Sequence, residues 1–175
     1  FPFRSGMSPH QPLRRRRILL PLALIENDQG VLSSVIWSLI RDRRNNRFET
    51  SGGNFQSVTL ETAGLGGDKS FVKMTLNNRY YTRLIGDLVF RNSTELGQMF
   101  ALGDRALPPS EKFYLGGPNN MKGYQLFLLG PTDVNTYGKQ VPLGGAYEIF
   151  SLFEIEYPLI REAGLKWVTF FDAGN

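Results

Sequence analysis

The sequence predicts an all-β fold, and three observations carry the prediction. Aromatic residues make up 13% of the 175 residues, and 19 glycines and 10 prolines are spread along the chain. Short segments of alternating apolar and polar residues recur between clusters of turn-forming residues, a pattern typical of β-strands. No apolar run reaches the roughly 20 residues that a transmembrane helix requires. We therefore expect antiparallel strands joined by turns, without a convincing helix.

Seven segments show this alternation. It is clearest in residues 70–83, where Val72 and Met74 share one face and Lys73 and Thr75 share the other. A period of two that separates apolar from charged side chains indicates a strand with one apolar and one polar face. The seven predicted strands are 17–26, 33–42, 55–63, 70–83, 88–101, 147–157 and 164–175.

The length of these strands favours a membrane location. Six of them run ten residues or more, which suits the roughly 9–11 residues that a tilted strand needs to cross a bilayer. Strands of soluble sandwiches are usually about 5–6 residues long. Alternation alone leaves a soluble sandwich or a lipocalin-like barrel open, because both have strands with one polar face. Asn92 is an exception to the pattern, since it falls on the apolar side of its strand.

A stretch rich in Gly, Pro, Asn and Asp separates the fifth and sixth predicted strands. It covers residues 103–145 and is longer than the irregular segments that compact domains usually contain. We expect it to be either disordered or functional. In the predicted domain organisation, residues 1–16 are a poorly ordered leader, and residues 17–175 form a partial β-barrel domain that includes this long loop.

Composition argues against several classes of function. The chain has no cysteine, and its single histidine, His10, lies in a Pro-rich leader. Disulfides, thiolate metal sites and imidazole catalysis therefore have no candidates in the body of the chain. Much of the basic excess sits in two clusters, residues 14–17 and 41–47, which lack interleaved stacking aromatics. We interpret these clusters as solvated strand ends and predict no nucleic-acid partner, catalytic residue, metal or cofactor.

The two ends of the sequence suggest a part of a longer protein. The first residue is Phe1, and the residues after it do not form the charged and apolar regions of a signal peptide. The last predicted strand, 164–175, stops without a turn after it. We therefore expect strands beyond both ends of the chain.

The long loop contains the most specific motif. KFYLGGPNNMKGYQLFLLGP, residues 112–131, resembles the long sixth extracellular loop of BamA-like outer-membrane barrels, the bacterial surface antigen family. In that family a Gly-Gly-Pro segment leads to a Val-Arg-Gly-Phe/Tyr motif. The corresponding residues here are Gly116, Gly117 and Pro118, which we expect to shape the loop, followed by Met121, Lys122, Gly123 and Tyr124.

Four other segments agree with the family in order and spacing. They are RDRRNNRFETSGG (41–53), LETAGLGGDKSFVK (60–73), FEIEYPL (153–159) and TFFDAGN (169–175), so that the resemblance covers residues 33–175. Each glycine-rich match alone is weak, but five in the expected order are specific. The resemblance implies an antiparallel transmembrane β-barrel of about 16 strands, of which this chain supplies about seven.

The resemblance also implies a site. In the family the loop folds back into the barrel lumen, and its arginine pairs with acidic residues of the wall. Carried over by motif, the cation is Lys122, the acids are Glu154 and Asp172, and Phe170 packs nearby. Gly123 is expected to let the loop backbone approach the wall. Since a lysine cannot make the two-pronged contact of an arginine, we expect looser docking. The alternative is that Lys122 is a solvated loop charge and Asp172 a strand-end acid.

The function that the resemblance implies is that of an outer-membrane protein assembly factor, an insertase that is not an enzyme. Its partners would be unfolded outer-membrane protein precursors, the lipid bilayer and assembly-complex lipoproteins that bind periplasmic POTRA repeats outside this chain. The location would be the bacterial outer membrane or, alternatively, an organelle outer membrane. Two other functions stay open: a polypeptide pore of two-partner secretion, and the barrel of a patatin-like outer-membrane protein. The chain contains no Gly-x-Ser-x-Gly motif of a patatin-like lipase.

Overall fold

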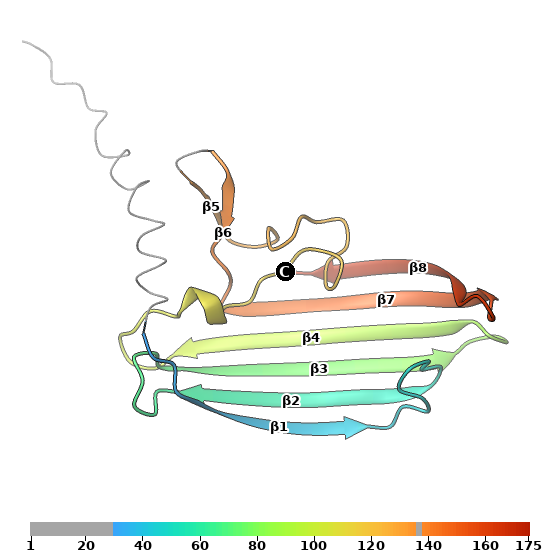
Figure 1. Ribbon diagram of the computed structural model, residues 1–175, viewed down its shortest axis with the longest axis horizontal. Helices are drawn as coiled ribbons and strands as arrows, with labels where there is room; N and C mark the ends of the chain where they lie inside the picture. The colour runs from blue at the N-terminus through green and yellow to red at the C-terminus, as the bar shows by residue number, and fades with distance from the viewer. Residues whose placement is uncertain (1–29, 136–137) are drawn as a thin grey trace, which may run out of the picture.

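One six-stranded antiparallel sheet dominates the fold (Figure 1). The computed structural model describes residues 30–135 and 138–175. Neighbouring strands pair in the order β1-β2-β3-β4-β7-β8, and a separate hairpin, β5-β6, lies in the connection between β4 and β7. The elements are β1 (Ser34–Asp42), β2 (Gly53–Ala63), β3 (Phe71–Arg83), β4 (Val89–Ala101), the 3₁₀ turn η1 (Pro109–Glu111), β5 (Thr132–Val134), β6 (Gln140–Pro142), β7 (Tyr147–Ile160) and β8 (Leu165–Gly174).

The all-β, antiparallel prediction is confirmed, and six of the seven predicted strands correspond to strands of the main sheet. The predicted strand 17–26 and the leader 1–16 lie outside the described residues. The expectation that residues 103–145 contain no strand or helix is wrong in part, because η1, β5 and β6 lie there. Within the described residues, no helix has the length and apolar character needed to cross a membrane.

Alternation along the strands gives the sheet two different faces. We call the face on which the connection between β4 and β7 packs the loop face, and the opposite one the outer face. Lys73 and Glu154 are on the loop face, where both contact residues of the connection. The outer face holds apolar rows across neighbouring strands, as a surface in contact with hydrocarbon requires. One such row, paired in register, is Val58, Leu76, Leu96 and Ile149.

The structure also explains the exception at Asn92. Its side-chain Nδ2 donates hydrogen bonds to Ser151 Oγ at 2.9 Å and to the Leu152 carbonyl oxygen at 3.2 Å. The Thr94 hydroxyl donates to Asn92 Oδ1 at 3.3 Å and lies 2.7 Å from Ser151 Oγ. These polar groups therefore satisfy one another between β4 and β7 on an otherwise apolar face.

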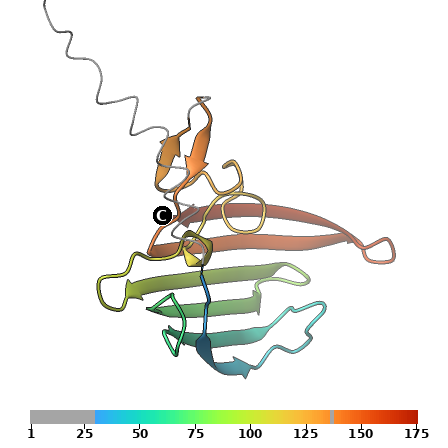
Figure 2. The same ribbon diagram turned by 60° about the vertical axis from the view of Figure 1, so that its left-hand side comes forward.

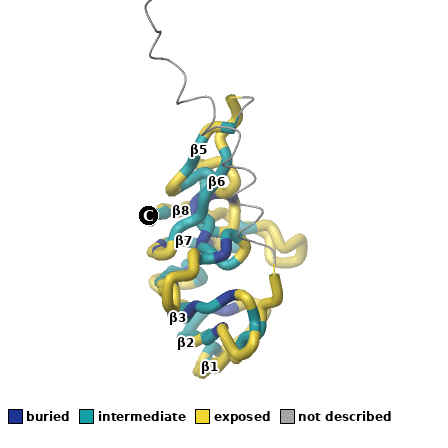
Figure 3. Tube along the Cα trace, turned by 90° about the vertical axis from the view of Figure 1, so that its left-hand side faces the viewer, coloured by how far each residue is buried: buried dark blue, intermediate teal, exposed yellow. Residues whose placement is uncertain are grey.

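The connection between β4 and β7 lies against one side of the sheet (Figure 2). Burial is concentrated where this connection meets the sheet. Elsewhere the chain is mostly exposed or half-buried (Figure 3). Outer-face side chains such as Trp37, Leu39 and Phe171 are 66–74% exposed, so the apolar outer face has no cover from the described chain. The two buried clusters are Ala63, Phe71, Met99 and Phe113, and Leu115, Met121 and Phe150.

The basic cluster 41–47 is more structured than the solvated strand end that we expected. The Arg44 guanidinium donates to both carboxylate oxygens of Asp42, at 2.9 and 2.8 Å, and lies 5.1 Å from the centroid of the Phe55 ring. These hydrogen bonds to Asp42 raise the pKa of Arg44 further above its ordinary value. The cluster 14–17 lies outside the described residues.

Candidate functional site: a loop docked on the sheet

The candidate site lies where residues 113–129 of the connection fold onto the loop face. Three isolated antiparallel bridges hold this segment in a compact shape: Phe113 with Gly145, Leu115 with Leu129, and Gly117 with Met121. Leu115 and Met121, both 3% exposed, pack against Phe150 of β7. Met121, the first residue of the predicted motif, is therefore an apolar anchor of the loop.

The Gly-Gly-Pro segment forms the turn that presents the motif. Gly116 and Gly117 have φ angles of +109° and +108°, a region that side chains rarely adopt. A Cβ at Gly116 would lie 2.3 Å from the Gln125 carbonyl oxygen, so only glycine fits. Pro118 is exposed in the turn between the bridged residues 117 and 121. Asn120, which the motif comparison did not single out, accepts hydrogen bonds from the Gly116 and Met121 backbone N–H groups.

Lys122 lies among the three wall residues that the sequence paired with it. Its ammonium nitrogen is 3.0 Å from Glu154 Oε1, 3.7 Å from Asp172 Oδ2 and 4.7 Å from the Phe170 ring centroid. Asp172 Oδ2 also accepts a hydrogen bond from the Lys122 backbone N–H at 3.0 Å. Glu154 and Phe170 are directly paired across β7 and β8. One loop residue is thus held by two carboxylates and an aromatic ring.

Burial makes these contacts stronger than a surface ion pair. The Asp172 side chain is 4% exposed, and those of Lys122 and Glu154 are 26% and 28% exposed. Water and salt screen charges less at such positions, so removal of Lys122 leaves a buried carboxylate without its cation. Asp172 Oδ1 is also buried without a hydrogen-bond partner among the described residues. Asp172 therefore depends strongly on the docked loop.

The last two residues of the motif are Gly123 and Tyr124, and the role of Gly123 differs from the one expected. Among the described residues, no atom lies within 4 Å of a Cβ placed at Gly123, so the expectation that a small residue there permits close approach to the wall is wrong. The φ of +88° is instead the reason for a glycine there. Tyr124 is 54% exposed, and its backbone N–H donates to the Met121 carbonyl oxygen.

A second anchor, which the sequence comparison missed, holds the start of the loop. The Phe113 ring lies against Gly97 of β4, where an added Cβ would come within 2.6 Å of the ring. Lys73 Nζ lies 5.0 Å from the centroid of the same ring and donates to the Glu111 carbonyl oxygen at 2.7 Å. The sequence signal that could have revealed this anchor is Gly97 itself, because a glycine inside a strand often marks the close approach of another group.

The site is suited to holding a chain segment. Its charges are satisfied by one another, and the described residues contain no group of three or more His, Cys, Asp or Glu that could hold a metal ion. Two anchors, one at Phe113 and one at Lys122, fix the loop to β4, β7 and β8. What the arrangement can do is keep a long connection folded against one face of a sheet.

Comparison with known proteins identifies the family of the chain. The model of the Omp85 superfamily domain matches residues 10–175. The sorting and assembly machinery component 50 homolog of Bos taurus is 33% identical over 113 residues, which cover 64% of this chain and 24% of that protein. The outer membrane protein assembly factor BamA of Nitratidesulfovibrio vulgaris is 27% identical over 136 residues, 77% of this chain and 17% of that protein. The chain thus spans a quarter or less of the length of these relatives.

A solved structure has the same arrangement of strands. The crystal structure of Haemophilus ducreyi BamA lacking POTRA domains 1–3 superposes with a TM-score of 0.72, over 81% of this chain and 29% of that one. Sequence identity in the superposition is 16%, so the likeness concerns the fold. It shows that a sheet of this kind occurs as a segment of a larger BamA barrel.

Proposed function

The chain belongs to the Omp85 superfamily, and from this premise we propose that its protein is an assembly factor that folds β-barrel precursors and inserts them into an outer membrane. Its location is the outer membrane, of a bacterium or of an organelle. The names of the relatives, BamA and sorting and assembly machinery component 50, support an assembly role. The observation that carries the proposal is the contact of Lys122 with Glu154 and Asp172.

The contact supports this function because it is consistent with a loop that folds into the inside of a barrel. In the proposed barrel the loop face lines the lumen, and the apolar outer face meets lipid. A loop anchored at Phe113 and Lys122 would then occupy the lumen and brace β4, β7 and β8 as one rigid wall. With β4, β7 and β8 held rigid, the barrel would open between other strands. The unpaired strand edge exposed there can template an incoming strand.

The partners follow from the mechanism. They are unfolded outer-membrane protein precursors, which would pair their strands with the open edge, and the bilayer around the apolar outer face. Assembly-complex lipoproteins are proposed to bind periplasmic repeats outside this chain. Strand pairing and insertion into the bilayer make or break no covalent bond. In this proposal the protein therefore works as an insertase and not as an enzyme.

The test is insertion by the full-length protein in liposomes. A urea-unfolded barrel precursor is added outside, and its folding is followed by resistance to protease and by heat-modifiable mobility in gels. We expect insertion to be faster than in empty liposomes and slower with Lys122→Ala than with the unchanged protein. Passage of a polypeptide into the vesicle interior without insertion would instead indicate a secretion pore. A lipid hydrolysis product would indicate a patatin-like protein.

A further inference from the structure

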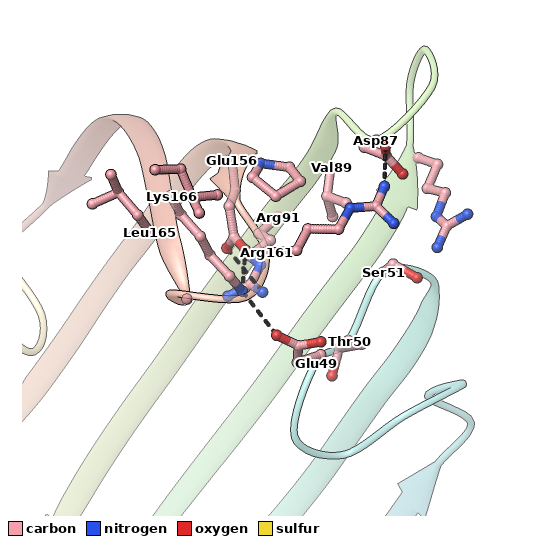
Figure 4. A pocket seen from close by; sticks show the side chains of 14 residues that line it. Glu49, Thr50, Ser51, Asp87, Val89, Arg91, Glu156, Arg161, Leu165 and Lys166 are labelled. Carbon is pink, nitrogen blue, oxygen red and sulfur yellow. Dashed lines mark hydrogen bonds and ion pairs between the residues drawn. The ribbon is translucent and has the colours of Figure 1, made fainter.

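A charged pocket lies on the loop face at the end of the sheet opposite the long loop (Figure 4). The turns between β1 and β2, β3 and β4, and β7 and β8 all meet at this end. The pocket has a volume of about 200 Å³, and its lining contains four basic residues and three acidic ones. The basic residues are Arg83, Arg91, Arg161 and Lys166, and the acidic ones are Glu49, Asp87 and Glu156.

The turn between β1 and β2, residues 43–52, reaches across the sheet to cover this pocket. Glu49 Oε1 lies 3.6 Å from Lys166 Nζ of β8. Three strands separate β2 from β8 in the sheet, which corresponds to roughly 19 Å at the usual strand spacing. The contact therefore requires the turn to fold over the loop face. The turn 43–52 thus lies at one end of the loop face, and the long loop lies at the other.

The turn is held together by hydrogen bonds of its own. Asn45 Oδ1 accepts hydrogen bonds from the backbone N–H groups of Ser51 and Gly52, and Thr50 Oγ1 donates to the Asn46 carbonyl oxygen. Gly53, at the base of the turn, has a φ of +104°, a conformation open to glycine. These bonds keep the shape of the turn independent of its contact with the far wall.

Two kinds of ion pair meet at Lys166. On the wall, Glu156 is 11% exposed and lies 2.6 Å from Lys166 and 2.9 Å from Arg91. Glu49, in contrast, is 75% exposed and makes the longer contact of 3.6 Å. An ion pair this exposed favours the closed turn by no more than about five-fold, so another carboxylate can replace it.

The pocket contains a basic side chain that could pair with such a carboxylate. Of the four basic residues that line the pocket, Arg83 takes part in no ion pair with another described residue, whereas Arg91, Arg161 and Lys166 each do. A volume of about 200 Å³ admits a side chain and is smaller than the roughly 300–1,000 Å³ of pockets for drug-sized ligands. The three turns at this end of the sheet and the strand ends beside them, residues 41–52, 79–91 and 156–166, contain nine basic and five acidic residues.

We propose that the turn 43–52 is a lid on this end of the loop face, and that its Glu49 occupies a carboxylate-binding site that receives an acidic side chain of an entering polypeptide. The proposal rests on the proposed function for the identity of the entering chain. The site itself consists of Lys166, Arg91 and Arg83. In the closed state Glu49 takes the place of the incoming carboxylate.

Closure is tested by disulfide formation in the full-length barrel, with any cysteines outside this chain replaced. The chain has no cysteine of its own, so an introduced pair is unambiguous. Glu49→Cys with Lys166→Cys should form a disulfide in the membrane, whereas Glu49→Cys with Lys139→Cys, a lysine of the long connection, should not. Absence of the first product in a correctly folded barrel would overturn the lid. This measurement needs no precursor, so its result is independent of insertase activity.

The ligand is tested with an extended peptide of alternating apolar and acidic residues, compared with its Asn and Gln counterpart by fluorescence anisotropy. Glu49→Gln should raise the affinity for the acidic peptide about five-fold, and Glu162→Gln, which removes a carboxylate outside the pocket, should leave it unchanged. Lys166→Gln should lower it about ten-fold or more, and Lys166→Arg should retain it. Equal binding of the two peptides, or no response to Lys166→Gln, would overturn the carboxylate site.

Discussion

Glu154 and Glu156 lie two residues apart on the loop face of β7, and each pairs with a cation that serves a different end of the sheet. Glu154 holds Lys122 of the long loop at 3.0 Å, and Glu156 holds Lys166 at 2.6 Å, next to the turn 43–52. The two covering segments therefore share one pair of strands, β7 and β8. A disturbance of this pair should loosen both of them.

Replacement of Lys122 should release the tip of the long loop. Lys122→Ala removes the cation from two carboxylates and a ring, and we expect docking of residues 117–129 to weaken by about 1–3 kcal/mol. Lys122→Arg should preserve or strengthen docking, because a guanidinium can make two parallel bonds to a carboxylate. Amide hydrogen exchange of this segment in the full-length barrel measures both effects.

The proximity of Lys122 and Asp172 can be tested directly by crosslinking. Cysteines at positions 122 and 172 should give a crosslinked product in the membrane-embedded barrel, since Lys122 Nζ lies 3.7 Å from Asp172 Oδ2. A pair at positions 122 and 171 should give none, because Phe171 is on the outer face of the sheet. No product from the first pair would contradict the docked loop.

Of the two wall carboxylates, Asp172 should matter more than Glu154. Asp172 binds the Lys122 backbone N–H as well as the ammonium group and is 4% exposed, against 28% for Glu154. We expect Asp172→Ala to weaken docking by about 2–3 kcal/mol and Glu154→Ala by about 1 kcal/mol. Asp172→Asn should fall between, because an amide oxygen still accepts the backbone hydrogen bond. Exchange rates that rank Glu154→Ala as the more severe change would refute this order.

Gly97 should tolerate no side chain, because its Cβ position is filled by the Phe113 ring and by Glu148 Cγ at 2.8 Å. Gly97→Ala would push Phe113 off the wall, and overpacking of this kind destabilises by about 1–3 kcal/mol. The measure is the temperature at which the barrel loses its heat-modifiable gel mobility. Gly52→Ala is the matched control, since no atom lies within 4 Å of its added Cβ. Equal effects of the two changes would speak against the Phe113 anchor.

The long strands were predictable because their alternation extends over many residues. In β3 and β7 the period of two places Lys73 and Glu154 on the loop face and apolar residues on the outer face. The face on which each of these side chains lies therefore follows from its position in the strand. The contact partners of Lys122 could be named only from the motif, since residues 50 positions apart carry no local signal of proximity.

Other features of the structure could not be predicted from the sequence. The strands β5 and β6 have three residues each, too few for periodicity to show. The reach of Glu49 to Lys166 depends on how the turn 43–52 folds over the sheet, which the turn sequence does not specify. The Phe113 anchor depends on a glycine, whose role becomes visible only when its neighbour across space is known.

The polar cluster on the outer face gives the last prediction, which concerns stability. Ser151 Oγ accepts from Asn92 Nδ2 at 2.9 Å and lies 2.7 Å from Thr94 Oγ1. Ser151→Ala leaves both partners short of a hydrogen bond on a surface without water, and we expect a loss of about 1 kcal/mol. The triple change Asn92→Leu, Thr94→Val and Ser151→Ala removes every member of the cluster, so it should be neutral or stabilising. Urea unfolding of the full-length barrel in liposomes compares the two, and a triple variant less stable than Ser151→Ala would show that the polar cluster itself stabilises the wall.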